Sequence, residues 1–316
     1  MFACRSIEKD VLISGTTMGT TYSILINSKT NIKQEYIKAS IDSLLFEINN
    51  KFSTYIDTSE ISIFNNHLDS MKVSDDFINL FNISSNISKL SNGSFDFTIL
   101  NIVELWGFGK KDKSPDVPND LEIKHQLNFT GIDKVKLNKR TLKKNNKNVK
   151  IDFSAIAKGW AVDQVALLIE DRSISNYMVE IGGEITTSGT NHLGELWSIG
   201  IASPNKNGKE LIASIKISNI SIATSGTYNN SFLYKGDRYS HLIDPITGYP
   251  IKHDIISATI LANNCADADA IATAVMVKGY DAGLYWIDSM PDVECLLIKK
   301  DKNGEYIQGR SAGFNY

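Results

Sequence analysis

The sequence predicts an α+β (mixed α/β) protein in which mixed sheets pack against helices. Two long segments, 32–52 and 76–90, place hydrophobic residues three and four positions apart, which is the spacing of one helix face. Short apolar runs bounded by turn-forming residues occur along the whole chain and are typical of strands. Because the strands and helices do not alternate regularly, we expect a mixed sheet and not a doubly wound parallel one.

The chain opens with two expected strands, 11–14 and 20–26, separated by a turn of hydroxyl and glycine residues over 15–19. The helix over 32–52 follows them. The helix over 76–90 ends at Asn92-Gly93, a pair that is common at helix C-termini.

The middle of the chain is more polar. Residues 110–125 are rich in Lys, Asp, Pro and Asn and are expected to form a surface loop. Residues 135–150 resemble a solvated basic hairpin with Asn145-Asn146 near its turn. A short strand over 149–153 is then expected to run straight into a helix over 154–171.

The second half continues with a strand over 177–181 that is stopped by Gly182-Gly183. The alanine-rich segment 265–274 has no turn-forming residue and is expected to be a helix. Further strands are expected at 196–202, 211–217, 220–224, 257–261 and 293–299.

Bulk composition narrows the class of protein. The chain has 316 residues, of which 42% are hydrophobic and 22% charged, ordinary values for a soluble globular protein. The net charge of -3 gives no electrostatic reason to expect binding of nucleic acid. No apolar stretch approaches the length of a transmembrane helix.

The three cysteines form neither a disulfide framework nor a zinc motif. Cys265 and Cys295 are expected to be small core residues. Ala3-Cys4 near the start resembles the end of a bacterial lipoprotein signal, and an ordinary N-terminus is the alternative. We therefore divide the chain into a tail over 1–10, with a possible lipid anchor at Cys4, and one domain over 11–316.

The alanine-rich helix carries the first candidate chemistry. Asp269 and Thr273 lie four residues apart and share a helix face, and their oxygens suit Mg²⁺ better than Zn²⁺. A close-packed helix whose threonine bonds to its own backbone is the simpler explanation of this segment alone. Asp267 lies on another side of the helix and is expected to be a capping or solvated residue.

A second candidate is the segment 151–161, where an acid at a strand end precedes a helix start. Helix N-termini attract phosphate, and Lys158 adds a cation. Asp152 has the chemistry to hold a ribose, an adenine amino group or a metal-bound water, and capping of the helix is its simpler role. Elsewhere, Tyr55 lies past the apolar face of its helix and suits stacking on a flat ligand.

Taken in order, these segments resemble the ApbE family of flavin transferases. The resemblance extends from residue 15 to residue 279, most of the chain. Each motif is only moderately specific, but seven in the same order are highly specific. The motifs are Met18-Gly19-Thr20, Ser53-Thr54-Tyr55 with Ser59-Glu60, Gly93-Ser94-Phe95-Asp96, 152–159, 180–184, 240–245 and 268–274.

The resemblance implies an ApbE-like (T-fold-like) architecture with largely antiparallel sheets. It implies an FAD:protein FMN transferase, which uses Mg²⁺ to transfer the FMN half of FAD to a Thr or Ser hydroxyl of an acceptor protein and releases AMP. The acceptor would be a subunit of a membrane redox complex or another exported flavoprotein. The implied location is the bacterial cell envelope, facing the periplasm, and a cytoplasmic enzyme is the alternative.

The resemblance also implies a site. Asp269, Lys158 and His241 would be catalytic, and the metal would be held by the carbonyl of Ala155 with the side chains of Asp269 and Thr273. By position alone, Asp244 serves as well as His241 for proton transfer. The FAD site would be lined by Met18, Tyr55, Ser94, Phe95, Asp96, Asp152, Lys158, Gly182, Gly183 and His241.

Two positions depart from the family pattern. Many members have Gly-Gly where this chain has Ser154-Ala155, which a carbonyl ligand tolerates. Thr227 stands where the family often has an acid, so that contact is open. Two other functions remain: an FAD pyrophosphatase giving FMN and AMP, and a non-catalytic flavin-binding lipoprotein. Asp269, Thr273 and Lys158 together argue against the latter, because binding alone does not need a complete metal–phosphate site.

Overall fold

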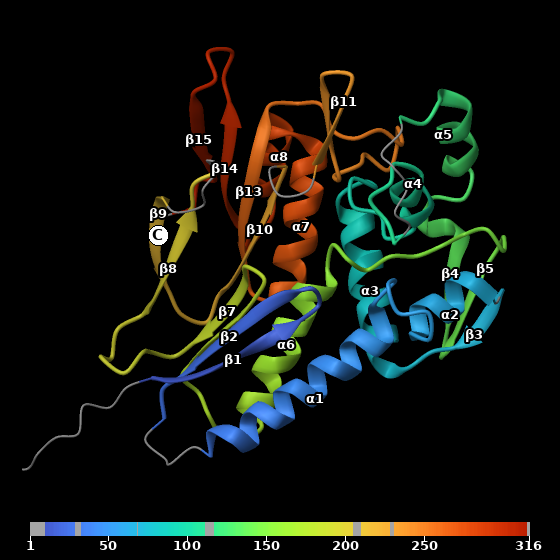
Figure 1. Cartoon of the computed structure of the whole chain (residues 1–316). Coiled ribbons are helices and arrows are strands. Elements are labelled where there is room, and N and C mark those ends of the chain that lie inside the picture. The colour runs from blue at the N-terminus through green and yellow to red at the C-terminus, as the bar shows by residue number, and fades with distance from the viewer. Residues whose placement is uncertain are drawn as a thin grey trace, which may run out of the picture.

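The computed structural model describes residues 10–28, 33–67, 69–110, 117–204, 210–227 and 231–314. Cys4 and the first nine residues of the predicted tail lie outside this part of the chain. The molecule has a larger sheet with helices on one face and a smaller lobe beside it (Figure 1).

The larger sheet has eight strands, and every neighbouring pair in it is antiparallel. This arrangement confirms the expected mixed fold with antiparallel sheets. The strands lie in the order β1 (Val11–Thr17), β2 (Thr20–Ile26), β6 (Tyr177–Ile181), β7 (Glu184–Ser188), β10 (Ser221–Gly226), β13 (Ile255–Ala262), β14 (Glu294–Lys300) and β15 (Tyr306–Arg310).

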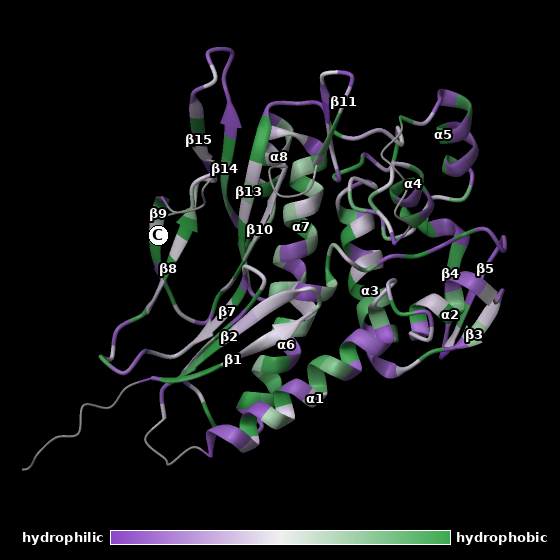
Figure 2. Ribbon diagram, in the orientation of Figure 1, coloured by the Kyte–Doolittle hydropathy of each residue, from purple (hydrophilic) through white to green (hydrophobic). Residues whose placement is uncertain are grey.

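Both faces of this sheet are covered. Successive residues of a strand point to opposite faces, and here they enter two different hydrophobic cores. On β10, Ala223 faces the main core, whereas Ile222 faces a second core under a two-stranded sheet. Figure 2 shows β13, in the middle of the sheet, as largely hydrophobic. The main core lies under α1 (Gln34–Phe52), α6 (Ala157–Glu170), α7 (Cys265–Lys278) and α8 (Tyr280–Asp288), and the second core lies under β8 (Trp197–Ala202) and β9 (Leu211–Ile217).

Helix α7 lies at the centre of the molecule. It packs against β10 and β13 on one side, and α3, α6 and α8 also contact it. Its residues are buried on nearly all sides, as is typical of a helix that is apolar all round. The alanine-rich segment is therefore a helix, as predicted, and it extends to Lys278.

The smaller lobe carries the chain from α1 to α6 and holds a three-stranded sheet in the order β3-β5-β4. A separate hairpin, β11 (Ser231–Tyr234) with β12 (Asp237–Ser240), follows β10. The lobe contains α2 (Glu60–His67), β3 (Ser70–Lys72), α3 (Asp75–Leu90), α4 (Leu100–Leu105), α5 (Asp120–Leu127), the short 3₁₀ helix η1 (Ile132–Lys134), β4 (Val135–Asn138) and β5 (Thr141–Lys144).

Two expectations for the middle of the chain are wrong. Part of the predicted loop over 110–125 is the helix α5. A capping box starts this helix: the side chains of Asn119 and Glu122 each accept a hydrogen bond from the other residue's backbone N–H. The predicted hairpin exists, but its turn is at Lys139-Arg140 and not near Asn145-Asn146. Lys139 has a φ of 54°, a left-handed value that a tight turn requires.

The predicted strand over 149–153 is also wrong, since this segment pairs with no strand in the part of the chain that the structure describes. The helix expected from 154 begins at Ala157, after a turn. Cys265 and Cys295 are buried free thiols, as predicted. Within the described residues, the helices are too short or too polar to cross a bilayer.

Candidate active site

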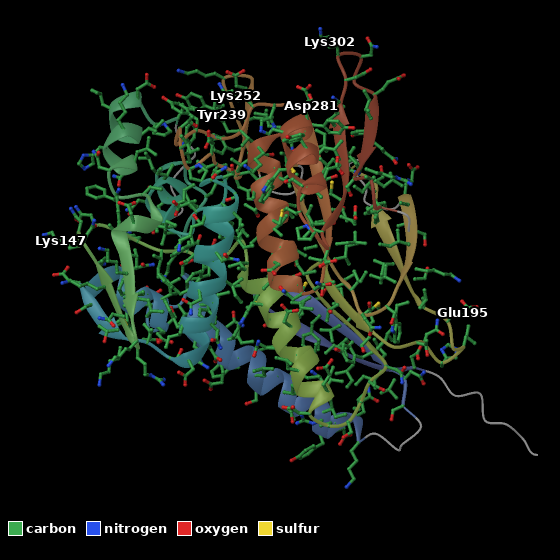
Figure 3. All side chains as sticks on the ribbon, turned by 180° about the vertical axis from the view of Figure 1, so that it is seen from behind. Lys147, Glu195, Tyr239, Lys252, Asp281 and Lys302 are labelled. Atoms are coloured by element: carbon green, nitrogen blue, oxygen red, sulfur yellow. The ribbon has the colours of Figure 1, made fainter. Side chains whose placement is uncertain are left out.

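A cavity of about 360 Å³ lies between α6, α7, β10 and three loops, at 94–100, 152–155 and 241–245. This volume is in the range of small-molecule sites. In Figure 3, α7 runs between the smaller lobe, marked by Lys147, and the far side of the larger sheet, marked by Glu195. All predicted site residues line the cavity except Met18 and Gly183, so the lining includes Tyr55, Ser94, Phe95, Asp96, Asp152, Ala155, Lys158, Gly182, His241, Asp269 and Thr273.

Asp269 and Thr273 lie one turn apart on α7 and line the cavity together, as their spacing predicts. Asp269 is only 6% exposed, and burial raises the pKa of its carboxyl against the opposing effect of Lys158 and of a backbone N–H. The Thr273 hydroxyl is 3.4 Å from that of Ser225 on β10, a long contact. Asp267 instead belongs to the helix cap, where its backbone N–H donates to Asn264 at 2.8 Å.

The start of α6 is irregular in a way that exposes a carbonyl. In a regular helix the N–H of Gly159 would donate to the carbonyl of Ala155, four residues earlier. Here it donates to Asp269 Oδ2 at 3.0 Å, and α6 begins only at Ala157. The Ala155 carbonyl, at the edge of the cavity, is therefore released from the helix hydrogen-bond pattern.

Lys158 forms an ion pair with Glu184, with 2.6 Å between Nζ and Oε1. Burial by itself lowers the pKa of Lys158, but the charges of Asp269 and Glu184 outweigh it and raise the pKa, so the ammonium stays charged. Glu184 lines the cavity, and its other oxygen, Oε2, is buried and has no hydrogen-bond partner among the described residues. Burial raises the pKa of Glu184, and the charge of Asp269 adds to that effect.

Glu184 is a site residue that the sequence analysis missed. It belongs to the motif 180–184, in which the family resemblance implied a role for the glycines alone. An acid at the start of a strand, directly after two glycines, was the available signal.

Asp152 is held at the cavity by its own neighbours and by a backbone hydrogen bond to the smaller lobe. Its Oδ1 accepts from the N–H and the hydroxyl of Ser154, at 2.9 and 2.6 Å, so it caps the turn before α6. Its N–H donates to the Phe97 carbonyl at 2.7 Å. Next to it, the Asn65 amide makes two hydrogen bonds with the backbone of Ile151, both at 2.8 Å. A side-chain amide here replaces the neighbouring strand that the sequence suggested.

Lys144 supports the same segment. It is only 3% exposed, which corrects the expectation of a solvated hairpin. Its ammonium donates to the carbonyls of Phe64, Asn65 and Val149 at 3.0 to 3.3 Å. Burial lowers the pKa of Lys144. Three carbonyls thus satisfy a cation that has no carboxylate within salt-bridge distance among the described residues.

The loop after α3 contributes three predicted residues. Its chain reverses at Asn92 and Gly93, which both have positive φ, and this turn presents Ser94 and Phe95 to the cavity. Phe95 is 3% exposed and also belongs to the main core. Asp96 accepts from the N–H and hydroxyl of Thr98 at 2.7 and 2.6 Å, and burial raises the pKa of its carboxyl.

Tyr55 and His241 line the cavity from other loops. Tyr55 follows α1 and is 60% exposed, in keeping with its predicted freedom from the core. His241 follows β12, with its ring centroid 6.3 Å from that of Phe108. Asp244, the alternative by position, lies outside the cavity lining. Its carboxylate accepts from the Ile246 N–H and the Thr247 hydroxyl, both at 2.9 Å, and holds a turn.

Met18 and Gly183 are the two predicted residues that do not line the cavity. Met18 lies in the β1–β2 turn with a φ of 49° and packs against the main core. Gly182 does line the cavity, and a β-carbon there would come within 2.9 Å of the Thr20 methyl group. Both glycines have positive φ, as the tight turn between β6 and β7 requires.

Among the described residues, no group of three or more His, Cys, Asp or Glu side chains is arranged to hold a metal ion. The oxygens of Ala155, Asp269 and Thr273 suit a hard cation that keeps several water or phosphate ligands, as Mg²⁺ does. They do not suit Zn²⁺, which prefers nitrogen and sulfur ligands.

Comparison with known proteins identifies relatives of this chain. The chain is 38% identical to the FAD:protein FMN transferase of Vibrio cholerae over 301 residues, covering 94% of this chain and 90% of that protein. It is 37% identical to the enzyme of the same name from Haemophilus influenzae, covering 98% of this chain and 92% of that protein.

Two solved structures share the fold of this chain over nearly its whole length. The flavin transferase ApbE from Vibrio cholerae superposes with a TM-score of 0.89 at 36% identity, covering 97% of this chain and 98% of that one. The apo form of the flavinyl transferase ApbE from Pseudomonas stutzeri gives a TM-score of 0.89 at 28% identity, covering 97% and 96%. A family model described as the ApbE family matches residues 18–297, and the chain belongs to that family.

Proposed function

We propose that this protein is an FAD:protein FMN transferase, which moves the FMN half of FAD to a Thr or Ser hydroxyl of an acceptor protein and releases AMP. The observation that carries the proposal is that Lys158, Asp269, Thr273 and Ala155 line one cavity together with aromatic and polar groups. The names of the relatives support the same activity.

In the proposed reaction, the acceptor oxygen attacks the phosphorus on the FMN side of the pyrophosphate. A new P–O bond forms, the P–O bond to the AMP phosphate breaks, and the hydroxyl proton leaves. Lys158, held by Glu184 and kept charged, neutralises charge on the phosphate oxygens. His241 is the proposed acceptor of the proton, because it lines the cavity and the carboxylate of Asp244 is engaged in a turn.

The donor set fits Mg²⁺, and we propose the Ala155 carbonyl, Asp269 and Thr273 as its ligands. The released carbonyl is the feature that favours this, since a helix would otherwise occupy it. When bound, the ion supplies Lewis-acid stabilisation of the pyrophosphate. The protein's own part is to hold these oxygens at fixed positions on α7 and on the turn that precedes α6.

FAD binding is proposed for the remaining lining residues. Tyr55 is exposed enough to stack on a ring, and Phe95 forms part of the wall. In Asp96 and Asp152, one carboxylate oxygen accepts a hydrogen bond from a neighbouring Thr or Ser hydroxyl. The second oxygen of each can accept from a sugar hydroxyl or a ring N–H of the ligand. Gly182 gives the ligand close access to backbone, and we propose the same use for Met18 and Gly183 at the adjoining turns.

The test is product analysis with FAD, Mg²⁺ and a candidate acceptor domain. AMP should accumulate without an equal amount of free FMN. Asp269→Ala should abolish turnover, whereas Asp267→Ala, which lies in the helix cap and outside the cavity lining, should keep it. Equal FMN and AMP would favour an FAD pyrophosphatase, and intact FAD would favour a flavin-binding protein. Full activity of Asp269→Ala would contradict the metal assignment.

The acceptor and the location are also proposals. We propose a flavoprotein subunit of a membrane redox complex as the acceptor, and a periplasm-facing location with a lipid anchor at Cys4. The support is Ala3-Cys4 near the start of the sequence. Radiolabelled palmitate should label the chain expressed in a bacterium from its full gene, and Cys4→Ser should remove the label. Labelling of Cys4→Ser would contradict the anchor.

A further inference from the structure

Helices α6 and α7 touch through their backbones beside the proposed metal ligands. A β-carbon on Gly159 would come within 2.2 Å of the Cys265 carbonyl oxygen and 2.8 Å of the Asp269 β-carbon. Such distances leave no room for a side chain between the helices. The relative position of α6 and α7 is therefore set by direct contact, and small shifts along this contact would move Asp269 relative to Ala155.

Two carboxylates cross this contact in opposite directions. Asp163 on α6 accepts from the N–H groups of Cys265 and Ala266, in the first turn of α7, at 2.8 and 2.9 Å. Asp269 on α7 accepts from the N–H of Gly159 on α6 at 3.0 Å. We call this pair the carboxylate clasp. Each helix thus supplies the acceptor for backbone N–H groups of the other.

Asp163 has no part in the proposed chemistry, since it lies outside the cavity lining. Yet it is the only charged residue of α6 between Lys158 and Glu170, in a stretch where Gln164 is the only other polar side chain. A half-buried carboxylate in such a helix is costly unless it is well hydrogen-bonded. Burial raises the pKa of Asp163 to about 7, with the N–H groups of Cys265 and Ala266 opposing that effect. The two N–H groups belong to the first turn of α7 and have no partner within their own helix, so the acceptor that they need comes from α6.

We infer that Asp163 is a positioning residue for the metal site: it fixes the register of α6 against α7 and so sets the distance between the Ala155 carbonyl and the Asp269 and Thr273 side chains. This inference rests on the proposed function, because it assigns Asp163 to the Mg²⁺ site of that proposal. It does not place Asp163 in contact with FAD or the metal.

The prediction is a selective loss of metal affinity. Asp163→Asn keeps the shape but places an amide N–H against a backbone N–H, which breaks half of the Asp163 contact. Partners behind a metal ligand typically contribute about 10–100-fold in metal affinity, and we expect a loss of that size. FAD affinity without metal should not change, because Asp163 lies outside the cavity lining.

The experiment measures two affinities on the whole protein, independently of turnover. Mn²⁺ binding is followed by electron paramagnetic resonance, and FAD binding in EDTA is followed by flavin fluorescence. Asp267→Ala is the matched control, because it removes an equal charge next to the turn of α7 that Asp163 contacts, while the hydrogen bonds of Asp267 go to Asn264 in the cap of α7 and not to α6. We expect weaker Mn²⁺ binding in Asp163→Asn alone, a matching rise in the Mg²⁺ concentration for half-maximal turnover, and recovery of kcat at high Mg²⁺.

Unchanged Mn²⁺ affinity in folded Asp163→Asn would overturn the inference, as would an equal loss of FAD affinity. If circular dichroism shows that Asp163→Asn does not fold, Asp163→Glu replaces it, since this variant keeps the charge but lengthens the side chain. Its Mn²⁺ affinity and its FAD affinity are measured in the same way. Failure of both to fold would make Asp163 a stability residue and also overturn the inference. If the unsubstituted protein binds no Mn²⁺ but still transfers flavin, the metal site is wrong and the transferase activity stands.

Discussion

The two sides of the cavity are held in place by different kinds of contact. On the α6/α7 side, two helices touch at Gly159 and exchange carboxylate-to-backbone hydrogen bonds. On the other side, the segment carrying Asp152 pairs with no strand among the described residues and is held by the side chains of Asn65 and Lys144. Groups on packed helices are positioned more accurately than groups on loops. The helix side thus suits fixed charge geometry at a pyrophosphate, and the loop side suits recognition of a large ligand.

Substitution at the helix contact should have the largest effect. In Gly159→Ala, the new β-carbon meets backbone, which cannot move aside as a flexible side chain can. We expect turnover to fall by about 100-fold or more, the scale reported for displacements of about 1 Å, and the free energy of unfolding to fall by about 1–3 kcal/mol. FAD turnover and urea unfolding measure the two effects.

Gly283→Ala in α8 is the matched control for this contact. Its new β-carbon meets the Val275 Cγ1 methyl group first, at 2.8 Å, and comes no closer than 3.4 Å to backbone. Wild-type turnover in Gly159→Ala would show that α6 and α7 can separate without loss of the site.

Asn65→Ala tests the loop side. It removes both hydrogen bonds to Ile151 and leaves a buried N–H and carbonyl unpaired, which should lower the free energy of unfolding by about 2–4 kcal/mol. The KM for FAD should rise, while the dependence on Mg²⁺ should stay the same. Asn101→Ala is the control, because that amide donates to the carbonyl of Asn148 just upstream but is exposed. A change in Mg²⁺ dependence would show that the two sides are not independent.

Tyr55→Ala should give a smaller and purely functional change. The side chain is 60% exposed, so stability should be preserved. Loss of a stacking contact of about 1–3 kcal/mol would raise the KM for FAD by about tenfold. Tyr55→Phe retains the ring and should behave as wild type. A normal KM in Tyr55→Ala would remove this residue from the proposed FAD site.

The smallest expected effect is the pH dependence of stability from Lys144. Burial lowers its pKa in the folded state from the ordinary 10.5, so the unfolded chain binds more protons between the two values. Stability should therefore rise as pH increases through that window towards 10.5. Lys144→Met should flatten this rise in urea unfolding series at pH 8, 9 and 10. An unchanged slope would mean that Lys144 titrates normally in the folded protein.

The sequence predicted the helix side better than the loop side. Asp269 and Thr273 could be placed on one face because helical spacing is regular, and an alanine-rich run identifies a helix without knowledge of its neighbours. The order of seven motifs identified most of the cavity lining. The fold class followed from the irregular mixture of strands and helices.

What the sequence did not reveal depends on contacts between distant residues. Residues 149–153 have the composition of a strand, but only the structure shows that Asn65, far away in the sequence, takes the place of a partner strand. Lys144 is one of several lysines in a polar stretch, and nothing local marks it as buried. The roles of Asp163 and Glu184 likewise depend on partners more than about twenty residues away in the chain, where spacing rules do not apply.

Intact-mass spectrometry of an acceptor flavoprotein domain tests the proposed flavin transfer most directly. The domain is incubated with this protein, FAD and Mg²⁺, and in parallel with Asp269→Ala or with EDTA. We predict that the acceptor gains the mass of FMN less one water only in the complete mixture, with release of AMP. An unchanged acceptor mass, while FAD is converted to equal amounts of free FMN and AMP, would contradict the transferase assignment.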